Sequence, residues 1–320
     1  MEEYTFNNII DIIEITKKYK LNRRKRPRNE TDVPYNWDME RLIECLPALK
    51  KLNNLIGMES VKKNIIDQVL FYTQKLNTNE MNHCCIYGNP GTGKTTLGKI
   101  LAELYCSLGF LKTDNFRVVG RSDLIAGYVG QTALKTMKVL TESLDGVLFI
   151  DEAYSIGGSE DERGSTYSKE CLDTINKFLS ENTTNFIMVI AGYKEEMEKY
   201  FFSMNKGLKR RFPWVYDITD YSAQNLKDIF VYQVRENYWF LHKDLNDEVL
   251  TCFFKEHFEL FNDNGGSTLV LFDKAKIIHS RRVFGKILKK VLSIQDLREA
   301  SKLMEKKPKL IKEPPFGMYI

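Results

Sequence analysis

Several features that define large protein classes are scarce or absent in this sequence. Its longest apolar runs, such as FIMVIA from Phe186, reach about six residues, whereas a membrane-spanning helix needs roughly 18 to 20. Its 47 basic and 43 acidic residues leave a net charge of only +4, too small an excess to indicate nucleic-acid binding by itself. No signal peptide is recognised. We therefore expect a soluble protein without a membrane partner.

The cysteines and histidines give no sign of a disulfide framework or a metal site. The six cysteines form no C-x-x-C pair and lie mostly within apolar segments, and the four histidines lack the spacing of metal ligands. The thiols are expected to be reduced core residues, which favours a cytoplasmic location. The cysteines are Cys45, Cys84, Cys85, Cys106, Cys171 and Cys252, and the histidines are His83, His242, His257 and His279.

What the sequence does contain is an alternation of short apolar runs with helical patterns. A hydrophobic fraction of 43% over 320 residues is enough for a sizeable core. The alternation predicts an α/β fold with a mostly parallel sheet flanked by helices. The runs are HCCIY from His83, FRVV from Phe116, GVLFID from Gly146, FIMVIA from Phe186 and PWVYDI from Pro213.

The same patterns divide the chain. Residues 38–220 are predicted to form the α/β domain, and 221–305, without a further buried strand, a smaller helical domain. Residues 1–37 are expected to hold a helix between Tyr4 and Tyr19 and a basic linker, and residues 306–320 a Pro-rich tail. The basic run Arg23–Arg28 is interpreted as a solvated linker, with a nuclear-targeting or nucleic-acid segment as the alternative.

The strongest motif is GNPGTGKTT, which matches the pattern G-x-x-x-x-G-K-[ST] through Gly88, Gly93, Lys94 and Thr95. An expected strand precedes it and an expected helix follows it, which is the context that this motif requires. Glycines let backbone N–H groups surround a phosphate at a helix N-terminus. Lys94 is then expected to neutralise the β- and γ-phosphates of ATP, and the Thr95 hydroxyl to bind Mg²⁺.

A second motif, GVLFIDEAY, places two adjacent carboxylates at the end of a predicted buried strand. Asp151 can complete the magnesium site, and Glu152 can orient and polarise the attacking water. A pair of surface acids is the alternative, but surface acids rarely end an apolar strand. Together the two motifs predict an ATPase rather than a protein that only stores nucleotide.

The order of the motifs resembles that of the AAA+ ATPases, most closely the CbbX/SpoVK branch, which includes ATPases of type VII secretion. The resemblance implies a large nucleotide-binding domain, a helical lid, and a ring, usually a hexamer, with ATP bound between neighbouring subunits. The segments that carry it are LIGMESVK, GNPGTGKTT, GYVGQTALKT, LFIDEAYS, VIAGYKEEM, NKGLKRRFP and HSRRV.

The resemblance also implies roles for individual residues. Ile56 and Gly57 match a loop that packs on adenine. Arg211 matches an arginine that reaches into the neighbouring subunit's site, with Arg210 as a second candidate. The remaining contacts to ATP are implied for the phosphate loop itself: Asn89, Pro90, Gly91, Thr92, Gly93, Lys94, Thr95 and Thr96.

Two further positions of the family pattern are less definite in this sequence. Arg281 of HSRRV matches a lid arginine that contacts the γ-phosphate, with Arg282 as the alternative register. The strand end VIAGYK lacks the Thr-Asn pair common in AAA proteins, so no polar residue is assigned there.

Tyr128 and Val129 lie between two glycines in a predicted turn, where apolar side chains would be exposed. The turn resembles pore loop 1 of AAA+ proteins that thread peptides, and aromatic rings can hold a chain without reading its sequence. Three functions stay open: a ring motor that remodels or threads a protein, a nucleic-acid motor or loader, and a nucleotide-gated assembly scaffold. The absence of Lys and Arg from the turn favours the first over the second. The protein substrate is not identified by the sequence.

Overall fold

The computed structural model describes residues 8–25, 37–77, 81–128, 130–157, 162–205, 207–285 and 289–305. The chain divides into two compact units, residues 1–220 and 221–320. Within the described residues, no helix is long and apolar enough to cross a membrane. No group of three or more His, Cys, Asp or Glu side chains that could hold a metal ion occurs in that same part of the chain.

Five parallel strands form the sheet of the first unit, in the order β2-β3-β4-β1-β5. The three central strands are almost continuously buried, as expected for a parallel sheet with helices on both faces. Each strand coincides with one of the predicted apolar runs, and the predicted α/β class is confirmed. The strands are β1 (Cys84–Gly88), β2 (Phe116–Val119), β3 (Val147–Ile150), β4 (Ile187–Gly192) and β5 (Trp214–Ile218).

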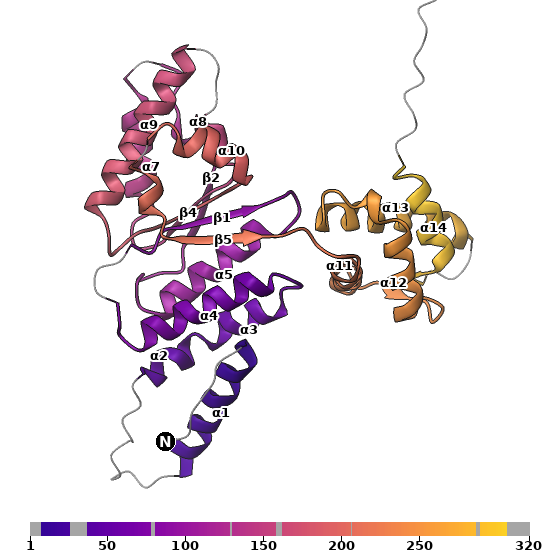
Figure 1. The fold of residues 1–320 in the computed structure, drawn as a ribbon. Coiled ribbons are helices and arrows are strands. Elements are labelled where there is room, and N and C mark those ends of the chain that lie inside the picture. The colour runs from indigo at the N-terminus through magenta and orange to yellow at the C-terminus, as the bar shows by residue number, and fades with distance from the viewer. Residues whose placement is uncertain are drawn as a thin grey trace, which may run out of the picture. The chain divides into compact units, whose positions relative to one another are not determined.

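Helices cover both faces of this sheet, with α3, α4 and α5 on one side and α7, α8 and α9 on the other (Figure 1). The apolar face of α5 is buried because its leucines recur at helical spacing. The helices of the first unit are α1 (Ile9–Lys25), α2 (Met39–Glu44), α3 (Leu46–Asn54), α4 (Glu59–Thr73), α5 (Lys94–Ser107), α6 (Arg121–Leu124), α7 (Thr132–Thr141), α8 (Tyr154–Gly157), α9 (Glu162–Glu181), α10 (Lys194–Glu196), the π-helix η1 (Met197–Phe202) and the 3₁₀-helix η2 (Lys209–Arg211).

The N-terminal helix α1 packs against α3 and buries Ile9, Ile12 and Thr16. It runs on to Lys25, so Asn22–Lys25, the start of the predicted basic linker, is helical. Arg and Lys are good helix formers, so this part of the predicted linker can extend the helix. The rest of the basic run, Arg26–Arg28, lies outside the described residues.

The second unit is helical, with one feature that the sequence does not predict. Two parallel strands of two residues pair through the N–H groups of Phe240 and His242, which donate to the carbonyls of Lys290 and Leu292 at 2.8 Å each. Strands this short leave no periodic pattern in a sequence. The elements are α11 (Ala223–Glu236), β6 (Phe240–Leu241), α12 (Asp247–Glu256), η3 (Phe258–Leu260), α13 (Gly265–Val283), β7 (Val291–Leu292) and α14 (Ile294–Lys302).

The cysteines are all free thiols, and most are buried as predicted. Burial raises the pKa of Cys45 and of Cys84 to about 12, so these thiols stay protonated. Cys252 is an exception to the predicted core location, because it is exposed on α12, where its thiol donates to Glu256.

Candidate active site

The turn between β1 and α5 has a backbone suited to close approach by a ligand. Gly91 and Gly93 have φ angles of +68° and +89°, in the left-handed region that glycine adopts readily. A Cβ atom at Gly88 would lie 2.8 Å from the Thr92 Oγ1 atom, which itself donates to the Asn89 carbonyl at 2.8 Å. Gly93 has no side chain to cap α5, so the first N–H groups of that helix can serve an external anion.

Lys94, the first residue of α5, lies across this turn. Its Nζ atom donates to the carbonyl oxygens of Gly88 at 2.8 Å and of Asn89 at 2.9 Å. Burial lowers the pKa of Lys94, and the negative charges of Asp151 and Glu152 oppose that shift. The lysine and the two acids of the second motif are therefore within electrostatic reach of one another.

Asp151 and Glu152 follow β3 directly, as the sequence predicts. The Oδ1 atom of Asp151 accepts a hydrogen bond from the Glu152 N–H at 3.1 Å. Glu152 is exposed and has a φ angle of +47°, a conformation that costs a residue with a side chain roughly 1 kcal/mol or more. Strain of this kind is most often found at functional sites.

Two tyrosines that were not predicted as site residues lie beside these groups. The rings of Tyr154 and Tyr193 are stacked, with centroids 5.5 Å apart and planes 29° from parallel. The Lys94 Nζ atom lies 5.5 Å from the centroid of the Tyr193 ring. Burial, and after it the nearby negative charge of Glu152, raise the pKa of Tyr154 to about 12. The only sequence signal was their position, just after two buried strands.

This arrangement fits the phosphates of a nucleotide and a magnesium ion. The turn combines left-handed glycines, an uncapped helix N-terminus and a lysine ammonium, which together suit a polyphosphate. The Thr95 hydroxyl and the Asp151 carboxylate are oxygen ligands of the kind that Mg²⁺ prefers. Ile56 and Gly57, expected near adenine, are half-buried in the turn between α3 and α4, where Gly57 has a φ angle of +69°.

Arg210 and Arg211 lie at the opposite end of the sheet from the phosphate loop. The register pairs Cys84 with Trp214 and Gly88 with Ile218, so the two ends of β1 are separated by roughly 13 Å. Arg211 precedes Trp214 and is half-buried, and its Nη1 atom lies 3.9 Å from the sulfur of Met81. Arg210 is exposed. Neither arginine belongs to the phosphate site of this chain.

The polar side chain of Arg211 is incompletely satisfied. Its Nε atom is buried and has no hydrogen-bond partner among the described residues. The N–H of a guanidinium can only donate a hydrogen bond, and this buried N–H has no acceptor among the described residues. The cost of such a group is of order 1–3 kcal/mol.

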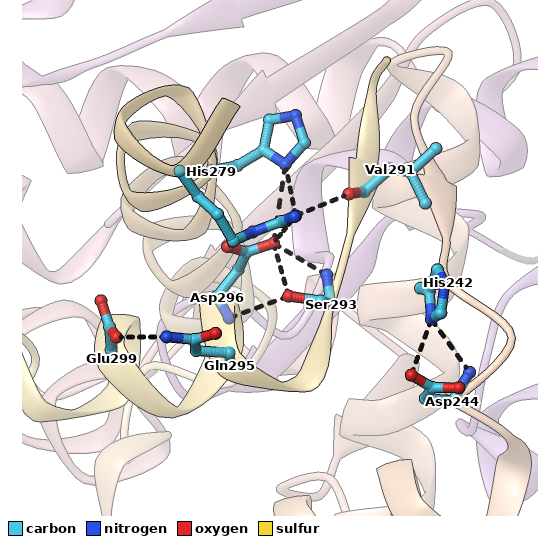
Figure 2. A network of polar contacts seen from close by, with 9 residues as sticks. His242, Asp244, His279, Val291, Ser293, Gln295, Asp296 and Glu299 are labelled. Atoms are coloured by element: carbon cyan, nitrogen blue, oxygen red, sulfur yellow. Dashed lines mark hydrogen bonds and ion pairs between the residues drawn. The ribbon is translucent and has the colours of Figure 1, made fainter. Parts of the chain in front are cut away.

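In the second unit, the two candidate lid arginines have different surroundings. Figure 2 shows the polar network that Asp296 forms there with Ser293 and His279. Arg282 donates from Nε and Nη2 to the two carboxylate oxygens of Asp296 at 2.9 and 2.8 Å, and its Nη2 atom lies 3.0 Å from His279 Nδ1. Asp296 is buried and also accepts from the N–H and hydroxyl of Ser293. Arg281 is exposed on the same turn of α13, and the ion pairs found in the described part of the chain do not include it.

The predicted turn around Tyr128 is an exposed loop between α6 and α7. Tyr128 has 74% of its surface exposed, and a Cβ atom at Gly127 or Gly130 would meet nothing within 4 Å. Val129 lies outside the described residues. Both ends of the loop are anchored: the Ala126 N–H donates to the Thr132 hydroxyl at 3.2 Å, and other side chains of α7 bind the carbonyls of the preceding segment.

An arginine that was also not predicted connects this loop to the acidic motif. Arg121, at the start of α6, donates from Nη1 to the carbonyls of Ser155 and Ile156 at 2.5 and 2.8 Å. The Ser155 N–H in turn donates to the Glu152 carbonyl at 2.8 Å. A short chain of hydrogen bonds thus runs from the backbone of Glu152 to the segment that precedes Tyr128.

This chain is similar in sequence and in fold to known proteins. The family described as ATPases associated with various cellular activities (AAA) matches residues 84–213. A cfxQ-like protein of Acanthamoeba polyphaga mimivirus is 34% identical over 298 residues, covering 91% of this chain and 71% of that protein. Stage V sporulation protein K of Bacillus subtilis is 36% identical over 216 residues, covering 63% of this chain and 65% of that protein.

The fold agrees with solved structures of AAA domains. The FIGL-1 AAA domain in complex with ADP superposes with a TM-score of 0.57 at 18% identity, covering 81% of this chain and 85% of that one. None of these relatives supports the nuclear alternative for the location. The chain therefore belongs to the AAA family of ATPases, in the CfxQ-like group that matches the CbbX/SpoVK branch, and its enzyme activity is ATP hydrolysis.

Proposed function

We propose that the protein forms a homo-oligomeric ring, a hexamer by family resemblance, that uses ATP hydrolysis to remodel or thread a protein substrate. The observation that carries the proposal is Tyr128, an aromatic side chain that is 74% exposed on a loop tied to the acidic motif. An exposed tyrosine between two glycines has no packing role in its own subunit. It fits a loop that grips a polypeptide by contact area rather than by sequence.

The nucleotide site supplies the chemistry. The backbone of the phosphate loop and Lys94 would bind the phosphates of ATP, with Thr95 and Asp151 as ligands of Mg²⁺, which would neutralise charge on the phosphates. Glu152 would accept a proton from the attacking water, since it is an exposed carboxylate at the end of β3. The remaining loop residues would contribute backbone contacts.

A neighbouring subunit would complete this site. Arg211 is roughly a strand length from its own phosphate loop, and its buried Nε atom lacks an acceptor within the described residues. Both facts favour a role across a subunit interface. There the guanidinium could stabilise the negative charge that develops on the transferred phosphoryl group. Arg210 is the exposed alternative. In the lid, we assign the γ-phosphate contact to Arg281, because Arg282 is engaged by Asp296.

The link from Glu152 through Ser155 to Arg121 supports coupling between the two sites. A change in the backbone at Glu152 would alter the carbonyls that Arg121 binds, and Arg121 begins the segment that leads to Tyr128. Loops that move with a catalytic cycle need such an anchor at one end and free glycines at the other. Gly127 and Gly130 meet that need.

The test compares ATPase rates with and without a permanently unfolded polypeptide, reduced and carboxymethylated α-lactalbumin. Wild type is expected to be stimulated, and Tyr128→Ala to lose the stimulation while keeping its basal rate. Tyr238→Ala is the matched control, because Tyr238 is 80% exposed but lies in the second unit. Equal stimulation of wild type and Tyr128→Ala would refute threading by this loop. Stimulation by single-stranded DNA with steep salt dependence would indicate a nucleic-acid motor instead.

A further inference from the structure

We propose that Glu198 is a positioning residue for Arg210 and Arg211, because the π-helix η1 that carries it holds the residues on both sides of this arginine pair. The inference rests on the role of Arg211 across a subunit interface proposed above. It goes beyond that role by naming the side chain that places the guanidinium. Loss of Glu198 would therefore impair hydrolysis in the neighbouring subunit's site and leave the chain's own phosphate loop unaffected.

The 3₁₀-helix η2, which carries both arginines, depends on anchors from outside. It is a single turn, Lys209–Arg211, in which the Phe212 N–H donates to the Lys209 carbonyl at 3.2 Å. Hydrogen bonds in 3₁₀-helices have poorer geometry than those in α-helices, so one turn holds its own position weakly. The placement of Arg210 and Arg211 is therefore set by the side chains that contact this turn.

Two such contacts come from η1. Ahead of the arginines, the Lys209 Nζ atom donates to both carboxylate oxygens of Glu198 at 2.8 Å each. Behind them, the Phe212 ring packs edge-on against Phe202, with centroids 6.1 Å apart and planes 70° from parallel. Glu198 and Phe202 are four residues apart, about one turn of η1, so they lie on the same side of it. One side of η1 thus contacts both ends of the arginine turn.

The Glu198 carboxylate is also fixed from the sheet. The Tyr87 hydroxyl donates to its Oε1 atom at 3.2 Å, and Tyr87 is a buried residue of β1, directly before Gly88. The helix η1 itself lies close against α8, because a Cβ atom at Gly157 would be 1.7 Å from the Tyr200 carbonyl oxygen. The carboxylate is therefore bonded from the rigid sheet on one side and from η2 on the other.

The ion pair between Glu198 and Lys209 contributes little to folding. The two side chains are 41% and 62% exposed, and water competes for both charges at such exposure. Glu198→Gln keeps an oxygen that can accept from the Tyr87 hydroxyl, but it removes the charge that holds Lys209. We therefore expect an unchanged thermal midpoint, which lets a loss of activity be assigned to the placement of the arginines.

The first test measures basal ATP hydrolysis. Glu198→Gln should lower kcat about tenfold, because a group that meets charge in the transition state acts only when it is accurately placed. The Kd for a fluorescent N-methylanthraniloyl derivative of ATP should be unchanged. Lys209→Met should lower kcat to the same extent, and the double variant no further. Glu195→Gln, at an exposed glutamate of α10, is the matched control and should be silent.

Two results of this first test would overturn the proposal. One is a Glu198→Gln kcat within about twofold of wild type. The other is a pair of losses from Glu198→Gln and Lys209→Met that multiply in the double variant, since independent effects would show that the two side chains do not act through their contact.

The second test locates the defect in the neighbouring site. An equal amount of inactive Lys94→Ala protein, which brings a correctly placed arginine, should raise the activity of a fixed amount of Glu198→Gln protein about fivefold. The reason is that half of the intact phosphate loops then face such an arginine. Addition of a Lys94→Ala/Glu198→Gln double variant is the control and should change nothing. Equal activity after both additions would mean a defect within the Glu198→Gln chain's own site, and would overturn the proposal.

A mixture of Lys94→Ala with Arg211→Ala separates this proposal from the function on which it rests. Recovery in that mixture without recovery of Glu198→Gln would overturn the positioning role alone. Failure of both mixtures would refute catalysis across the interface, and the positioning role with it. All rates are measured without polypeptide, so they do not depend on the threading test.

Discussion

At the scale of single residues, the proposed site separates the groups that would bind phosphate from the group that would promote attack. Lys94 lies on the phosphate loop, whereas Glu152 is an exposed acid on a different strand end. Glu152→Gln would remove the proposed base and leave the phosphate loop intact. We expect kcat to fall by about 10² to 10⁴ with little change in ATP affinity, measured by initial rates and by nucleotide binding. A Glu152→Gln variant with the kcat of wild type would show that another group is the base.

The sequence can identify the motif residues as candidates because their spacing along the chain is local. Lys94 follows Gly93, and Glu152 follows Asp151, so a short pattern identifies each pair. The contact between Lys94 and Tyr193 could not be predicted in this way. It depends on β4 lying beside β1 in the sheet, which joins residues far apart in sequence.

At the scale of structural elements, the network of Figure 2 fixes the end of α13 against the start of α14. Arg282→Ala would leave the buried Asp296 carboxylate without its cation. Because Arg282 is partly exposed and water can replace it in part, we expect a loss of about 2 kcal/mol in the stability of the second unit. Arg281→Ala should leave the thermal midpoint unchanged and lower ATP hydrolysis. If Arg281→Ala instead lowered the thermal midpoint and Arg282→Ala lowered only ATP hydrolysis, the γ-phosphate contact would belong to Arg282 and the structural role to Arg281.

The same network predicts a pH dependence. Burial raises the pKa of Asp296, but hydrogen bonds from Arg282 and Ser293 outweigh it and hold the pKa below its usual value. A carboxylate whose pKa is lower in the folded state stabilises that state above its unfolded pKa. The stabilisation should be complete above about pH 5 and be lost as pH falls below about 4. Thermal melts from pH 7 to pH 3 would show it, and Arg282→Ala should show a smaller decline.

The strands of the sheet were predictable elements, and those of the second unit were not. Central strands such as β3 and β4 are apolar at every position because both faces are covered, which makes them visible as short runs. The pairing of β6 with β7 has only two residues on each side and rests on backbone hydrogen bonds. Backbone pairing of that length leaves no mark on side-chain choice.

At the scale of the whole molecule, the account requires more than one subunit in each active site. Lys94→Ala and Arg211→Ala proteins should each be inactive alone. Mixed in equal amounts, they should regain activity at about a quarter of the subunit interfaces, where an intact phosphate loop meets an intact arginine. Mixing Lys94→Ala with a Lys94→Ala/Arg211→Ala double variant is the control and should restore nothing. No recovery in the first mixture would refute catalysis across the interface.

The central claim is that Tyr128 contacts a polypeptide when ATP is bound. The direct measurement places the photo-crosslinker p-benzoylphenylalanine at Tyr128 or, as control, at Tyr238, in a Glu152→Gln background with ATP or ADP and reduced, carboxymethylated α-lactalbumin. The account predicts crosslinks from Tyr128 with ATP, few with ADP, and none from Tyr238. Absence of crosslinks from Tyr128 with ATP, or equal yields at the two positions, would contradict it.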